Sequence, residues 1–136
     1  MISPKGRVVM ISGASRGIGF AVARNLYEAG FSLSLGARDI EGMRATVKDW
    51  DEARVLIGKY DAVDKQTHKS WVDATVAHFG RIDGLVNNAG IMQPVSVDDG
   101  DFNEKGLDLM WSVNVKAPLS MTCLALPHLR LSLIHI

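Results

Sequence analysis

Short apolar runs alternate with segments of helical periodicity over the first 86 residues. The run at residues 7–11 is apolar and β-branched and ends in a Ser/Gly turn, so it predicts a buried strand. From residue 17 the spacing becomes helical, with Ile18, Val22 and Leu26 on one predicted face and a glycine stop at Gly30. Further strands are expected at 31–35, 53–57 and 80–86, and further helices at 40–49 and 64–79.

The last third of the chain predicts one long helix. It is expected over residues 102–126, with a break allowed at Pro118 and an end at Pro127. Trp71 and Trp111 have the spacing of core residues within their helices. The final segment, 131–136, is apolar enough to take a fifth-strand position, and we expect it to be a non-native or truncated tail following a partial domain at 1–130.

This alternation of strands and helices predicts an α/β fold. The expected architecture is a Rossmann-like, doubly wound parallel sheet with right-handed crossovers, cut short after the fourth or fifth strand. In such sheets ligands bind beyond the carboxyl ends of the strands. The two most distinctive motifs, at 12–19 and 87–90, each follow a predicted strand directly. They are therefore expected to meet at one edge of the sheet.

The first motif is a glycine loop with the spacing Gly-x-x-x-Gly-x-Gly, formed by Gly13, Gly17 and Gly19. A dinucleotide pyrophosphate must approach the amides at a helix N-terminus, and side chains at these positions would block that approach. The spacing differs from Gly-x-Gly-x-x-Gly, and no Gly-Lys-Ser/Thr follows as in a phosphate-binding P-loop. The alternative is an ordinary glycine-rich turn.

Two arginines bear on the choice of cofactor. Arg38 follows the second predicted strand, where an arginine accommodates the 2′-phosphate of NADP and a carboxylate would hold the ribose of NAD. Asp39 comes one or two positions too late for that carboxylate, and Arg16 adds a second cation from the glycine loop. Because guanidinium donates in a planar fork that suits phosphate, NADP(H) is predicted over NAD. The alternative is two solvated surface arginines.

The motif residues together resemble the short-chain dehydrogenase/reductase family. Residues 12–19 are similar to its Thr/Ser-Gly-x-x-x-Gly-Ile-Gly loop, residues 87–90 match its Asn-Asn-Ala-Gly signature, and the similarity extends to about residue 130. The resemblance implies an NADP(H)-dependent oxidoreductase that moves a hydride between nicotinamide and a carbonyl or alcohol substrate. The expected cofactor-binding residues are Gly13, Ser15, Arg16, Gly17, Ile18, Gly19, Arg38, Asp61, Ala62, Asn87, Ala89 and Gly90.

The resemblance also implies individual roles at the two ends of the cofactor. Asp61 is expected to accept from the adenine amino group beside Ala62, whereas Asp64 is expected to cap the next helix. The small residues Ala89 and Gly90 leave room for a ribose, and the Asn87 amide is expected to tie neighbouring strand ends together.

Asn114 matches a family asparagine that holds a water in a proton relay to a catalytic lysine, and it is the one catalytic residue predicted here. The alternative for Asn114 is a polar core residue satisfied locally. The family also uses a serine and a Tyr-x-x-x-Lys. The tyrosines here are Tyr27 and Tyr60, and neither is followed four residues later by lysine. We therefore expect this chain to bind the cofactor without turning over substrate, as the fragment of a longer enzyme.

The composition argues against several other classes of protein. Fifteen basic and fifteen acidic side chains leave no net charge to attract nucleic acid or an anionic membrane. A single cysteine, Cys123, allows no internal disulfide and no cysteine metal cluster, and no metal site is expected. No apolar run approaches the ~20 residues of a membrane span, so a cytoplasmic location is expected.

Two further expectations concern assembly and alternative functions. The resemblance implies association through the long helix at 102–126 together with the helix after the catalytic tyrosine, so the whole protein is expected to be a homo-oligomer. The alternative functions are a non-catalytic nucleotide-binding or partner-binding protein and, with less support from the loop spacing, a sugar-nucleotide epimerase.

Overall fold

The computed structural model describes residues 2–96, 98, 100 and 102–134. Its parallel sheet has the order β3-β2-β1-β4, so β1 lies inside the sheet and β4 at one edge. The strands are β1 Val8–Ser12, β2 Ser32–Ala37, β3 Val55–Lys59 and β4 Gly84–Val86. The helices are α1 Gly17–Ala29, α2 Ile40–Thr46, α3 Lys65–Phe79, α4 Glu104–Trp111 and α5 Ala117–Ile134, with a 3₁₀ turn η1 at Glu52–Arg54 and a π-helical turn η2 at Ser112–Lys116. The predicted α/β, Rossmann-like fold is confirmed.

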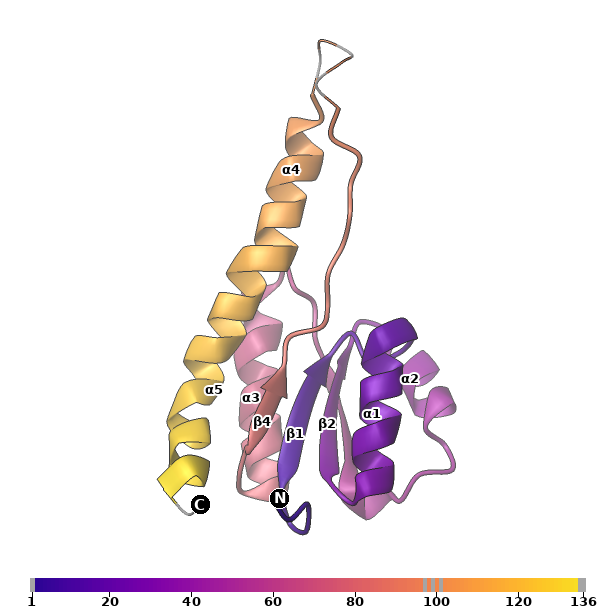
Figure 1. The fold of residues 1–136 in the computed structure, drawn as a ribbon, viewed down its shortest axis with the longest axis vertical. Coiled ribbons are helices and arrows are strands. Elements are labelled where there is room, and N and C mark those ends of the chain that lie inside the picture. Colours follow the sequence, from indigo (N-terminus) through magenta and orange to yellow (C-terminus); the bar gives the residue numbers. More distant parts are fainter. Residues whose placement is uncertain (1, 97, 99, 101, 135–136) are drawn as a thin grey trace.

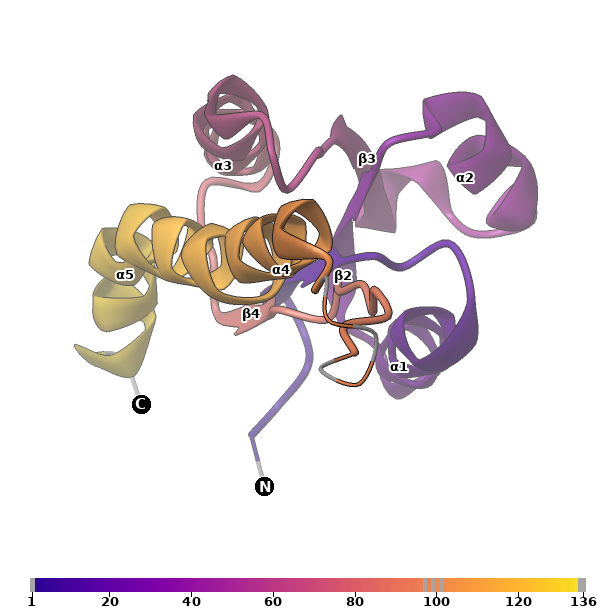
Figure 2. The same ribbon diagram turned by 90° about the horizontal axis from the view of Figure 1, so that it is seen from above.

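Helices cover both faces of the sheet (Figures 1 and 2). Strand side chains alternate between the two faces because successive residues of a strand point in opposite directions. Val9, Ile11, Leu33 and Leu35 form one core with residues of α1 and α2. The second core lies against α3 and α5 and contains Met10, Tyr60, Trp71, Val72, Ile82 and Met121.

The second core is organised around Trp71, which is 1% exposed. Its indole lies against Gly36 and Gly58, which are paired across β2 and β3. A Cβ added to Gly58 would lie 2.1 Å from the indole Cδ1, and one added to Gly36 would lie 2.6 Å from Cη2. The indole N–H donates to the Ser34 hydroxyl at 2.9 Å, so the ring is both packed and hydrogen-bonded. The predicted packing role of Trp71 is confirmed.

The segments α4, η2 and α5 follow one another without a break and extend beyond the carboxyl edge of the sheet (Figure 1). The prediction that Pro127 ends the helix is wrong, because α5 runs through it to Ile134. Proline at 127 removes the donor to the Cys123 carbonyl, and Cys123 is exposed, so water can satisfy that carbonyl. Near Pro118 the helix widens into the π turn instead of breaking.

The expected strand character of the tail is also wrong. Residues 131–134 continue α5, while residues 135 and 136 lie outside the described residues. Ser132 is 6% exposed and donates its hydroxyl proton to the Asp83 carboxylate. This bond attaches the end of α5 beneath the amino ends of the strands.

Two predicted core residues are on the surface. Ile18 is 78% exposed and Trp111 is 56% exposed. In α1 the buried positions are Gly19 and Ala23, whose small size lets the helix approach the sheet closely, and Ile18 is rotated away from that contact. Helical spacing identified a face in each case, but it could not show how far that face extends.

Candidate functional site

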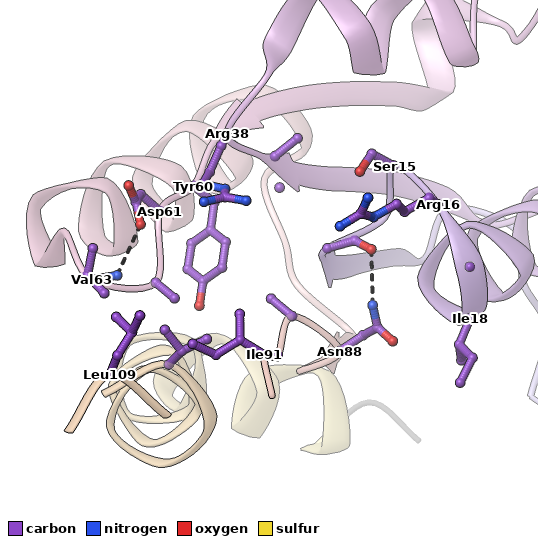
Figure 3. Close-up of a pocket in the computed structure, with 18 residues that line it drawn as sticks. Ser15, Arg16, Ile18, Arg38, Tyr60, Asp61, Val63, Asn88, Ile91 and Leu109 are labelled. Atoms are coloured by element: carbon purple, nitrogen blue, oxygen red, sulfur yellow. Dashed lines mark hydrogen bonds between the residues drawn. The ribbon is translucent and has the colours of Figure 1, made fainter. Parts of the chain in front are cut away.

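A cavity of about 490 Å³ opens at the carboxyl ends of the strands (Figure 3). It is lined by the loop after β1, the end of β2 and the segments that follow β3 and β4, with two residues from the α4–η2 helix. The lining residues are Gly13, Ser15, Arg16, Gly17, Ile18, 36–38, 60–63, 88–91, Leu109 and Val113. Both motifs predicted to share one edge of the sheet therefore lie at the same cavity.

The glycine loop brings the N-terminus of α1 to this cavity. Gly13 and Gly17 have φ of +66° and +58°, which only glycine adopts without strain. Gly19 does not line the cavity; a Cβ there would lie 2.3 Å from the Gly13 carbonyl oxygen and 2.3 Å from Asn88 Nδ2. Arg16 is the N-cap of α1 and provides no side-chain cap, so the first amides of the helix are not occupied by one. Uncapped helix amides and the helix dipole favour an anion here.

Asn88, not Asn87, ties the strand ends together. Asn88 Nδ2 donates to the carbonyl oxygens of Ser12 at 3.1 Å and Gly13 at 3.0 Å, and the Asn88 N–H donates to the Ser12 hydroxyl. Asn87 Nδ2 instead donates to the Thr122 hydroxyl on α5 at 3.3 Å and does not line the cavity. The expected link between neighbouring strand ends is present, but Asn88 forms it and Asn87 does not.

Basic groups gather where β2 and β3 end. Arg16 and Arg38 both line the cavity and are exposed, and Lys59 donates to the Arg38 carbonyl oxygen. The Asp39 carboxylate caps α2 by accepting from the Gly42 N–H at 2.9 Å. The carboxylate that follows β2 is thus engaged in holding a helix.

Asp61, Ala62 and Val63 form the turn after β3 and line the cavity. The Asp61 carboxylate accepts from the Val63 N–H at 3.1 Å. Asp64 caps α3 by accepting from the Gln66 N–H at 3.0 Å, as predicted.

His68, which is 1% exposed, contacts the Asp61 carbonyl oxygen at 3.1 Å through Nε2 and the Ser120 hydroxyl at 2.9 Å through Nδ1. This buried imidazole fixes the turn after β3 against α5.

Asn114 lies in the π turn and acts on the segment after β4. Its amide oxygen accepts from the Ile91 N–H at 2.9 Å, and its amide nitrogen donates to the Ile91 carbonyl oxygen at 2.8 Å. Asn114 itself does not line the cavity. Pro118, four residues later, has no N–H to give to the Asn114 carbonyl, so that oxygen lacks its usual helical donor. Asn114 is exposed and its partner lies 23 residues away in the sequence, so the alternative of a locally satisfied core residue is wrong, and the part of Asn114 in a proton relay stays a prediction.

Of the predicted site residues, all line the cavity except Gly19, Asn87 and Asn114. Sequence reasoning missed Gly36, Ala37, Tyr60, Val63, Asn88, Ile91, Leu109 and Val113. For Val63 and Ile91 the signal was position, since both directly follow predicted site residues. Leu109 and Val113 give no local signal, because only the tertiary fold brings α4 and η2 to this edge.

Tyr60 is the most informative of the missed residues. It directly follows β3, is 4% exposed and lines the cavity. Burial and, to a lesser degree, the adjacent Asp61 carboxylate raise the pKa of the Tyr60 hydroxyl to about 12. A general acid or base needs a pKa near the working pH, so this tyrosine is not suited to proton transfer.

In the part of the chain that the structure describes, no three His, Cys, Asp or Glu side chains are grouped to hold a metal ion. No helix within the same residues has the length and apolar character needed to cross a bilayer.

The family model described as short chain dehydrogenase matches residues 7–132. The chain is 45% identical over 125 residues to an agropine synthesis reductase of Rhizobium rhizogenes, covering 90% of this chain and 28% of that protein. It is 35% identical over 130 residues to 11-beta-hydroxysteroid dehydrogenase-like 2 of Arabidopsis thaliana, covering 93% and 42%. The chain thus spans less than half the length of these curated relatives.

Solved structures agree with this match. A metagenomic short-chain oxidoreductase in complex with NADP has a TM-score of 0.81 and 31% identity, covering 93% of this chain and 58% of that one. A 3-ketoacyl-(acyl-carrier-protein) reductase from Brucella melitensis complexed with NADH has a TM-score of 0.83 and 28% identity, covering 93% and 51%.

Proposed function

The chain belongs to the short-chain dehydrogenase/reductase family, and from that premise we propose that its cavity binds NADP(H). The whole protein then transfers a hydride between the nicotinamide and a carbonyl/alcohol pair of a small-molecule substrate. The cofactor supplies the hydride chemistry, and the protein supplies binding and orientation.

The observation that carries the choice of NADP(H) is the arrangement of charge after β2. Arg38 and Arg16 line the cavity, and Lys59 lies against the Arg38 backbone. A 2′-phosphate adds two negative charges and acceptor oxygens that guanidinium groups recognise. The ribose diol of NAD would need a carboxylate acceptor after β2, and Asp39, whose carboxylate accepts from the Gly42 N–H at the start of α2, does not line the cavity.

Other residues would hold the rest of the cofactor. The uncapped N-terminus of α1 suits the pyrophosphate. The Asp61 carboxylate accepts from the Val63 N–H through Oδ1, and its other oxygen, Oδ2, would accept from the adenine amino group. Ala89 and Gly90 leave space for a ribose, and Asn114 fixes the adjoining backbone at Ile91.

Substrate turnover is assigned to the whole protein and not to these 136 residues. They contain no Tyr-x-x-x-Lys, and Tyr60 has a pKa of about 12. Positioned acid–base groups contribute roughly 10²–10⁴-fold to such reactions. We expect this chain alone to bind the cofactor and leave a carbonyl substrate unreduced.

The test is a calorimetric titration of the chain with NADPH and NADH, which differ only by the 2′-phosphate. NADPH should bind more tightly. Arg38→Ala should weaken NADPH binding about tenfold, the lower end for a charged hydrogen bond because Arg38 is exposed, and should leave NADH nearly unchanged.

The matched control is Arg24→Ala, which removes an exposed arginine of α1 that does not line the cavity. It should change neither affinity. Equal affinities of the unsubstituted chain for NADPH and NADH would contradict the assignment of NADP(H). Binding of neither nucleotide by a folded sample would contradict the nucleotide site itself.

A further inference from the structure

The Tyr60 hydroxyl is a polar group at the cavity with no role in holding the fold. Tyr60 is 4% exposed and lines the cavity, and its hydroxyl has no hydrogen-bond partner among residues 2–96, 98, 100 and 102–134. Figure 3 shows the phenol ring directed from the end of β3 toward the side of the cavity that contains Ile91. The described residues leave no buried side-chain oxygen or nitrogen without a partner, so the Tyr60 hydroxyl oxygen is accessible from the cavity and can bond to a ligand that enters it.

The ring is held firmly before any ligand binds. Its centroid lies 5.1 Å from that of Trp71 and 5.2 Å from that of His68. The Tyr60 N–H also donates to the Ala37 carbonyl oxygen at 3.0 Å, which fixes the backbone. A side chain that is already ordered loses little conformational freedom on binding, so its hydrogen bond contributes more fully to affinity.

The surroundings of the hydroxyl select the chemistry of the partner. Ala62, Val63, Leu109 and Val113 line the same cavity with apolar side chains. Such walls suit a flat heterocycle, whose ring nitrogens then need a donor from the protein. Resting on the function proposed above, we propose that the Tyr60 hydroxyl donates a hydrogen bond to a ring nitrogen of the adenine of bound NADP(H).

The protonation state of Tyr60 agrees with this role. With its pKa raised to about 12 by burial and by Asp61, the hydroxyl keeps its proton at every pH at which the protein is handled. The unsubstituted ring nitrogens of adenine are acceptors, and a neutral phenol is a donor for them. Tyr60 thus contributes to recognition of the base, while Asp61 accepts from the amino group of the same ring.

The test removes only the hydroxyl. Tyr60→Phe keeps the aromatic ring in the second core, and Tyr27→Phe is the matched control, because its hydroxyl accepts from the Asp51 N–H far from the cavity lining. Affinities for AMP, NADPH and reduced nicotinamide mononucleotide are measured by calorimetry. Tyr60→Phe should weaken AMP and NADPH about 5- to 10-fold and leave the mononucleotide unchanged. Tyr27→Phe should change none of the three.

Deaza analogues identify the acceptor. AMP analogues with carbon in place of one ring nitrogen, at position 1, 3 or 7, are compared on both proteins. One analogue should bind the unsubstituted chain and Tyr60→Phe equally, because the acceptor is gone. Equal AMP affinity of the two proteins would overturn the inference, and so would a Tyr60→Phe deficit that persists with all three analogues. Failure of the unsubstituted chain to bind any nucleotide would instead overturn the proposed function, and this inference with it.

Discussion

Replacing Gly19 with alanine tests whether the glycine loop is set by packing as well as by conformational freedom. Gly19 lies in α1 with ordinary helical geometry, so its φ does not require glycine. On helix propensity alone, alanine would stabilise the chain by up to ~1 kcal/mol. The added Cβ, however, would lie 2.3 Å from both the Gly13 carbonyl oxygen and Asn88 Nδ2, where ordinary contacts begin at 3.4 Å.

The two effects have opposite signs, and the clash is larger. Overpacking of this kind costs about 1–3 kcal/mol. Moving Asn88 away also breaks its bonds to the Ser12 and Gly13 carbonyls, each worth ~1 kcal/mol. After subtracting the gain in helix propensity, we expect Gly19→Ala to lower the free energy of unfolding by about 2–4 kcal/mol.

Urea unfolding followed by tryptophan fluorescence measures this change. With a slope of about 2 kcal/mol per molar urea, the midpoint should fall by about 1–2 M at an unchanged slope. NADPH affinity should fall as well, because the loop and the N-terminus of α1 are displaced together. Gly80→Ala is the control: its φ is +77° but a Cβ there meets nothing within 4 Å. It should cost stability only through backbone strain, ~1–2 kcal/mol, and leave NADPH binding intact.

A Gly19→Ala protein as stable as the unsubstituted chain, with the same nucleotide affinity, would refute the reasoning. That result would mean that α1 can shift away from β1 and Asn88 without cost. The loop would then depend on the positive φ of Gly13 and Gly17 alone.

Two further predictions concern the core and the far end of the sheet. Gly58→Ala should lower the free energy of unfolding by about 2 kcal/mol or more, because the added Cβ would lie 2.1 Å from the Trp71 indole. In a double-mutant cycle, Trp71→Phe should reduce that loss by ~1 kcal/mol, and additive effects of the two substitutions would contradict the proposed clash. Burial raises the pKa of the Asp83 carboxyl. Hydrogen bonds from Arg81, Ser132 and the Val8 N–H, together with the Arg81 charge, outweigh burial and lower that pKa below its ordinary value. The unfolding free energy should therefore decline as the pH falls below about 4, and Asp83→Asn should flatten that decline; an unchanged acid profile would contradict it.

Local signals made much of this fold predictable. The β-branched runs and the glycine stops set the strands and α1, and Gly30 ends that helix with φ of +104° as expected. The cap formed by Asp64 could be predicted from the sequence because a capping side chain bonds within its own turn. Gly13 and residues 15–18 could be predicted as site residues for a similar reason, because a loop between a strand and a helix needs glycine where a ligand approaches.

The wrong or missing predictions concern residues whose role depends on contacts between distant parts of the chain. Asn87 and Asn88 are adjacent amides, and only the twist after β4 determines which of them reaches the Ser12 carbonyl. Proline normally ends a helix, yet α5 continues past Pro127 because the lost hydrogen bond falls on the solvent side while Met121 and Ala125 stay buried. Tyr60 was overlooked because it lies just beyond the strand expected at 53–57, and only the fold brings it to the cavity.

The position of β1 inside the sheet has a consequence for synthesis. Its pairing with β2 joins residues such as Val8 and Ser32, but its pairing with β4 joins Val9 to Gly84. At about 5–20 residues per second, the ribosome needs roughly 3–10 s to make the chain from Ser32, the partner in β2, to Gly84, the partner in β4. During that interval the β1 edge, Val-Val-Met-Ile-Ser, lacks its second neighbour. A nascent chain that has not yet emerged to β4 is therefore the form most in need of a chaperone.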